Sequence, residues 1–134
     1  MYFQYFYGSP KELCAFYRIP KQLFSSKYFS ALSADAKLLY GILLDRIELS
    51  VQNGWKDGSG RVYIYYPIEE IKRTFACSND KAVRMMRELD FRKGIGLIEV
   101  VRQGQGKPSR IYVKQPIGDT PQEEWALRCA SYEK

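Results

Sequence analysis

The sequence predicts an α+β domain in which two short helices, separated by a tight turn, are followed by a β-hairpin. Apolar residues recur at spacings of three and four over 67–75 and again over 78–89, as they do in amphipathic helices. The segments 97–102 and 111–114 are rich in β-branched residues and indicate short strands, joined by the exposed, Gly-rich and basic loop GQGKPSR. A helix-turn-helix followed by a hairpin is the winged-helix arrangement.

The first part of the chain predicts an aromatic arm and then the start of the domain. We expect the arm over residues 1–15, broken at Gly8-Ser9-Pro10, and the winged-helix domain over 16–114. Residues 16–19 alternate well enough for a short strand. Pro20 would end that strand and suits the first position of a helical turn over 20–24.

A large buried helix is expected next, beginning at the N-cap Ser33 and ending at Asn53-Gly54. Its broad apolar stripe follows helical spacing and consists of Leu38, Leu39, Ile42, Leu43, Arg46, Ile47 and Leu49. The segment Tyr63-Ile-Tyr-Tyr66 is then typical of a strand. It is placed to pair with the hairpin, which predicts a small three-stranded antiparallel sheet together with three to four helices.

The helix-turn-helix has recognisable start signals. Pro67 suits the first position of the first helix, and Ser78 is a good N-cap for the second. The inward face of the second helix is predicted to hold Ala82, Val83, Met86 and Leu89, with Met85 at the flank and Asp80, Lys81, Arg84, Arg87 and Glu88 outside. After this helix, Gly94 and Gly96 are expected to supply positive-φ positions before the first hairpin strand.

Positive charge is concentrated in one part of the chain. The 134 residues carry a net charge of +6. Residues 78–114 hold nine Lys and Arg against four Asp and Glu, so they account for five of the six surplus charges. A basic surplus confined to the second helix and the hairpin is expected of a surface that contacts phosphates.

Other classes of function find little support in the composition. The chain has no His, and its three cysteines are widely spaced, so we expect neither a metal site nor a cofactor. It lacks a GxxxxGK[ST] phosphate loop, and we expect no enzymatic activity. No signal peptide or membrane-length apolar run is found, which predicts a cytoplasmic protein without membrane contact. Residues 115–134 are expected to form a linker and a short C-terminal helix, the start of a further region.

Several strings together resemble a known family. They are FYRIPKQLF (16–24), LSADAKLLYGILLDRIELSVQNGW (32–55), GRVYIYY (60–66), CSNDKAV (77–83), KGIGLIE (93–99) and RQGQGKPSRIYVK (102–114). As a set they are similar to the replication initiator protein A (RepA) N-terminal domain family of bacterial plasmids, whose relatives also occur in integrated mobile elements. The resemblance implies a winged-helix domain that binds repeats at a replication origin. It also implies self-association, and host replication proteins as partners of a C-terminal region.

The predicted function is therefore sequence-specific binding of double-stranded DNA. The second helix would reach base edges, and the hairpin loop would contact the backbone or the adjacent minor groove. The predicted contact residues are Ser78, Asn79, Lys81, Arg84, Arg87, Gln103, Gln105, Lys107, Ser109 and Arg110. Two alternatives stay open: a winged-helix transcriptional regulator, and a winged helix used for protein–protein docking.

Overall fold

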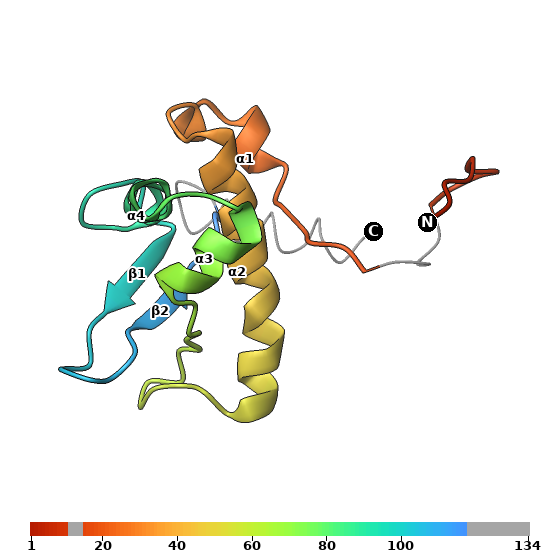
Figure 1. Ribbon diagram of the computed structural model, residues 1–134. Coiled ribbons are helices and arrows are strands. Elements are labelled where there is room, and N and C mark those ends of the chain that lie inside the picture. Colours follow the sequence, from red (N-terminus) through yellow and green to blue (C-terminus); the bar gives the residue numbers. More distant parts are fainter. Residues whose placement is uncertain (11–14, 118–134) are drawn as a thin grey trace.

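A long helix runs through the middle of the computed structural model, which describes residues 1–10 and 15–117 (Figure 1). This helix, α2, spans Ala34–Asn53. The Ser33 hydroxyl accepts the backbone N–H of Ala36, and Gly54 ends the helix in the left-handed region at φ 72°, so both predicted end signals are confirmed. Neither α2 nor any other helix of the described ranges has the apolar length needed to cross a membrane.

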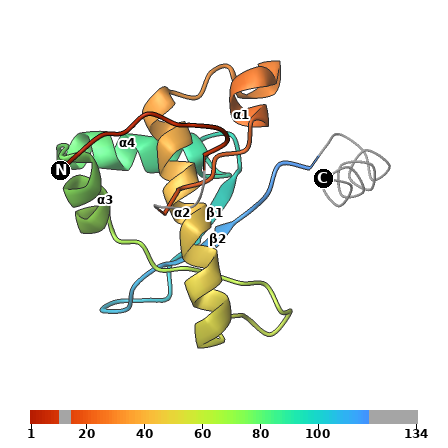
Figure 2. The same cartoon turned by 90° about the vertical axis from the view of Figure 1, so that its right-hand side faces the viewer.

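The other elements surround α2. They are α1 (Gln22–Ser25), a 3₁₀ turn (Lys27–Phe29), α3 (Ile68–Phe75), α4 (Asn79–Leu89), β1 (Ile98–Val101) and β2 (Arg110–Val113). The four α-helices of the described chain agree with the predicted three to four. Both α4 and β2 contact α2, while α3 packs against α4 (Figures 1 and 2). The helix-turn-helix and the hairpin therefore share one core with α2.

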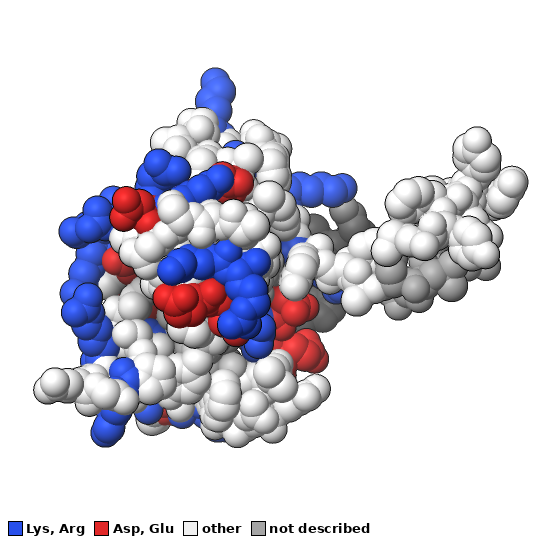
Figure 3. All heavy atoms as spheres, viewed as in Figure 1, with Lys and Arg blue, Asp and Glu red and all other residues white. Residues whose placement is uncertain are grey.

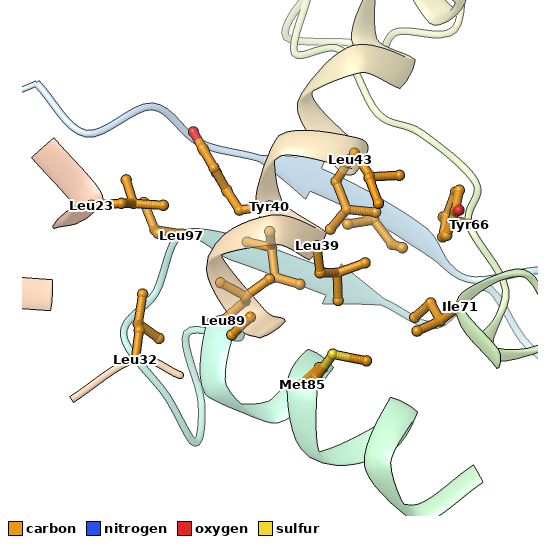
Figure 4. Close-up of a cluster of buried hydrophobic side chains, with 14 of the residues drawn as sticks. Leu23, Leu32, Leu39, Tyr40, Leu43, Tyr66, Ile71, Met85, Leu89 and Leu97 are labelled. Carbon is orange, nitrogen blue, oxygen red and sulfur yellow. The ribbon is translucent and has the colours of Figure 1, made fainter. Parts of the chain in front are cut away.

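The core forms where α2 meets α4 and the hairpin (Figure 4). Leu39 and Leu43 of α2 are fully buried, as the predicted stripe requires, but Leu38 and Leu49 are exposed. Tyr40, which the stripe omitted, is also fully buried, and its hydroxyl donates a hydrogen bond to the carbonyl of Lys114. Burial raises the pKa of Tyr40 to about 12, because the phenolate would lose its hydration.

The predicted three-stranded sheet is wrong in its third strand. Among the described residues the sheet has two antiparallel strands, with Ile98 opposite Val113 and Val101 opposite Arg110. The segment 61–66 joins β2 only at Ile64, which exchanges two backbone hydrogen bonds with Ile111. One residue earlier, the N–H of Tyr63 bonds to Trp55 instead. The segment changes partner within one residue, so no continuous ladder forms.

The predicted strand over 16–19 is also not formed. These residues form neither helix nor strand, and their backbone passes over α2 at Gly41. A Cβ at Gly41 would lie 2.6 Å from Ile19 Cγ1 and 3.2 Å from the Arg18 carbonyl oxygen. Contact with a helix leaves this segment no neighbouring strand to pair with, whatever its side-chain alternation.

The two ends of the chain differ in what the structure describes. Residues 1–10 form neither helix nor strand, and the aromatic side chains Tyr2, Phe3, Tyr5, Phe6 and Tyr7 are exposed. Residues 118–134, over which most of the linker and the C-terminal helix are predicted, lie outside the described residues.

Candidate nucleic-acid interface

Helix α4 presents a different set of side chains to each of its surroundings. Its N-cap is Ser78, whose hydroxyl accepts the Lys81 N–H as predicted. The buried face consists of Ala82, Met85 and Leu89. The prediction placed the inward face of α4 wrongly by a rotation about the helix axis. Met85, predicted at the flank, is buried in the core, whereas Val83 and Met86, predicted inward, are only half-buried. The side that faces away from the core carries Asn79, Asp80, Arg84 and Arg87, which are all exposed.

Hydrogen bonds and an ion pair connect one side of α4 to the start of α2. The carboxylate of Glu88 accepts both the backbone N–H and the hydroxyl of Ser33, each at 2.8 Å. Seven residues earlier on α4, Lys81 Nζ lies 3.0 Å from an Asp35 carboxylate oxygen. The carboxylate of Glu88 thus bonds to Ser33 and not to the cationic side chains on the outer side of α4. Lys81, a predicted base contact, lies at the margin of the outer face in an ion pair.

We expect Glu88→Ala to lower the free energy of unfolding by about 1–2 kcal/mol, because two charge-assisted hydrogen bonds at the start of α2 are lost. Urea denaturation measures this loss. Glu48→Ala is the matched control, since Glu48 is an exposed carboxylate on α2 itself. Equal effects of the two substitutions would contradict the assigned role of Glu88, as would strict additivity between Glu88→Ala and Ser33→Ala.

A cleft of about 790 Å³ lies between the outer side of α4 and the hairpin. Val83, Met86 and Arg87 of α4 form one wall, and Val100, Val101 and Arg102 form the other. Pro67 and Ile68, at the start of α3, also line the cleft. Asp90 lies in the cleft and accepts the Val100 N–H at 3.4 Å, which ties the end of α4 to β1.

Four cationic side chains surround this cleft. Arg87, Arg92, Lys93 and Arg102 all line it, and all four are exposed. In Figure 3, Lys and Arg gather along the edge where Figure 1 shows α4 and the hairpin. Only Arg87 was among the predicted contacts. Arg92, Lys93 and Arg102 belong to the basic surplus of residues 78–114. The excess of positive charge in this stretch therefore indicated them, although no sequence motif did.

Gln103 holds the loop between β1 and β2, residues 102–109, by two hydrogen bonds of its side chain. Its amide donates to the Tyr65 hydroxyl at 3.3 Å and to the Pro108 carbonyl at 2.8 Å. The first of these bonds lowers the pKa of Tyr65, because it stabilises the phenolate. Gln105 and Lys107 are exposed on the loop, and Ser109 lines the cleft. Gln103 therefore shapes the loop, while Gln105 and Lys107 extend from it.

Arg110, another predicted contact, packs against aromatic side chains instead of extending from the hairpin. Its guanidinium carbon is 4.2 Å from the centre of the Tyr63 ring. Tyr63 in turn makes edge-to-face contacts with Tyr65 and Tyr112, at ring-centre distances of 5.6 and 6.0 Å. Arg61 covers Tyr112 in the same way, at 5.0 Å. Arg110 is thus part of a cation–aromatic cluster on the sheet face opposite to that of Ile111.

The structure therefore brings together Asn79, Arg84 and Arg87 on the outer side of α4, with Ser109 in the adjoining cleft and Gln105 and Lys107 on the loop. Ser78 and Lys81 lie at the start of α4, and each already has a partner within the protein. Gln103 and Arg110 make contacts that support the hairpin. Among the described residues, no group of three or more Cys, Asp or Glu side chains could hold a metal ion.

Comparison with known families assigns this fold to a class. The family model described as the replication initiator protein A (RepA) N-terminus matches residues 15–123. The chain therefore belongs to this family, as its sequence strings indicated. It is also 34% identical over 111 residues to a 41 kDa protein of Lactobacillus helveticus. That match covers 78% of this chain and 30% of the relative, so the chain spans less than a third of the relative's length.

Solved structures resemble the chain over most of its length. A Rep–DNA complex contains a chain that is 31% identical, with a TM-score of 0.68, covering 90% of this chain and 89% of its own. The N-terminal domain of a DNA-binding protein is 30% identical, with a TM-score of 0.66 and coverages of 90% and 88%. An MDR initiator is 30% identical, with a TM-score of 0.63 and coverages of 87% and 89%.

Proposed function

We propose that this chain binds double-stranded DNA as a winged helix, with α4 as the recognition helix and the β1–β2 hairpin as the wing. The observation that carries this proposal is the cleft between them, which Arg87, Arg92, Lys93 and Arg102 surround. A sugar–phosphate strand separates the major groove of a duplex from the adjacent minor groove. With that strand along the cationic rim of the cleft, α4 would enter the major groove and the loop 102–109 would approach the minor groove.

The residues around the cleft would divide the work of binding. Arg84 and Asn79 are exposed on the outer side of α4, where Arg suits guanine and Asn suits adenine. The four cations around the cleft, together with Lys107, would contact phosphates and supply affinity without sequence information. Ser78 and Lys81 would touch DNA from the start of the helix, beside their internal partners. This function is binding without catalysis.

The DNA we propose is the set of repeats at a replication origin, because the chain belongs to a family of replication initiators. The similarity to a chain solved in a Rep–DNA complex supports DNA as the partner. We extend the proposal to self-association, supported by the exposed aromatic side chains of residues 1–10. Host replication proteins would bind a region outside the part of the relative that this chain spans.

A salt-resolved titration tests the proposal. The chain is first used to select a binding site from a pool of random duplexes, and the selected duplex is then compared with unselected DNA. We expect at least about 10³-fold tighter binding to the selected site, and a steep fall of affinity with salt on both duplexes. Absence of binding to any duplex at low salt would overturn the proposal in favour of a protein-docking role.

We expect Arg84→Ala to cost about 1–3 kcal/mol on the selected site and to relax specificity at one base pair, because the bidentate contact to guanine is lost. Binding measured on a panel of single-base variants shows which position is relaxed. Lys107→Ala is the matched control on the loop, and it should weaken binding on all duplexes alike. An equal loss on selected and random DNA for Arg84→Ala would make Arg84 a phosphate contact only.

A further inference from the structure

The side of α4 that borders the cleft combines polar, apolar and charged side chains in one stripe. Asn79, Val83 and Arg87 follow one another at intervals of four, so they lie on the same side of the helix. Val83 is half-buried and Arg87 is exposed, and both line the cleft. Val83 is thus an apolar group on the surface that we assign to DNA, between two residues suited to polar contacts.

The core does not account for the position of Val83. The buried face of α4 is complete with Ala82, Met85 and Leu89, whereas Val83 lies on the cleft side with Met86 next to it. A valine cannot exchange hydrogen bonds with a base edge or a phosphate. In the major groove the apolar group that a protein can contact is the C5 methyl of thymine. The cationic rim makes a duplex the occupant that matches the cleft in charge.

We propose that Val83 reads a thymine by packing against its 5-methyl group, with Met86 completing the apolar surface behind it. This inference rests on the proposed binding of duplex DNA, and it adds a specificity-determining residue. Burying one methyl group corresponds to roughly a fourfold change in affinity. A contact of Val83 with a deoxyribose instead would be insensitive to the base.

The test removes the methyl group from the DNA and the valine from the protein independently. Thymines of the selected duplex are replaced by deoxyuridine one at a time, which deletes only the 5-methyl group. For the unchanged chain we expect one position, within the base pairs adjacent to the one that Arg84 reads, at which affinity falls about fourfold. Val83→Ala should bind the thymine duplex about fourfold more weakly and show no further loss with deoxyuridine at that position.

Val51→Ala is the control, since Val51 is an exposed valine near the end of α2. It should retain the full sensitivity to deoxyuridine. The inference is overturned if no deoxyuridine position weakens binding of the unchanged chain. It is equally overturned if Val83→Ala keeps the sensitivity of the unchanged chain. In both cases the unchanged chain still binds its selected duplex, so the failure is distinct from failure of the proposed function, in which no duplex is bound at all.

Discussion

Replacing Arg87 and Arg102 together by alanine is expected to weaken binding to any duplex by more than about 100-fold, the largest effect on DNA that the structure predicts. Both side chains are exposed, on opposite walls of the cleft, and neither forms an ion pair with another described residue. A hydrogen bond to a charged group contributes about 1.5–3 kcal/mol, so two lost phosphate contacts exceed a factor of 100. The slope of log K against log salt should become shallower by about 2.

The control for this pair changes the net charge equally at other places. Lys27 and Lys56 are exposed lysines outside the helix-turn-helix and the hairpin, and their joint replacement by alanine should leave the salt slope unchanged. If the control pair weakened binding as much as Arg87 and Arg102, the attraction would come from the overall positive charge. The cleft would then not be the place where phosphates bind.

Local signals were sufficient to predict the helices. Ser33 and Ser78 both cap helices through their hydroxyl groups, as predicted, because capping depends on residues within one turn. The limits of β1 and β2 also lie within one residue of the predicted ones. The third strand could not be predicted in the same way. Its pairing depends on Trp55 and Ile111, which lie on opposite sides of it and are distant from each other in sequence.

The candidate site shows the same difference between local and distant information. The exposure of Arg84 and Arg87 follows from helical spacing, and the structure agrees with it. Lys81 and Arg110 have the same charge and lie in the same basic stretch, but their neighbours Asp35 and Tyr63 come from remote segments. Spacing within a helix also could not fix its rotation about the core, which is why Met85 rather than Met86 is buried.

Gly94→Ala is expected to lower the free energy of unfolding by about 3 kcal/mol, the largest stability effect of a single added methyl group that we predict. A Cβ at Gly94 would lie 2.1 Å from the Glu88 carbonyl oxygen and 2.2 Å from that of Arg87. These atoms are backbone, so they cannot move aside as a side chain could. Gly94 and Gly96 were both predicted as positive-φ positions, but of these two only Gly96 has positive φ, at 91°. At Gly94 the glycine is required by the close approach of the backbone instead.

The expected loss arises because the chain folds back over the end of α4 at this point. The N–H groups of Ile95 and Gly96 donate to the carbonyls of Glu88 and Leu89, which the helix leaves without partners. Displacing Gly94 would break both bonds, and thermal unfolding should show a melting temperature lower by roughly 10 °C. Gly58→Ala is the matched control, because its added Cβ would meet nothing within 4 Å and its φ is not positive. Equal melting temperatures for the two variants would mean that the end of α4 shifts at no cost. In that case Arg92 and Lys93, which lie between the end of α4 and Gly94, would not be held beside the cleft.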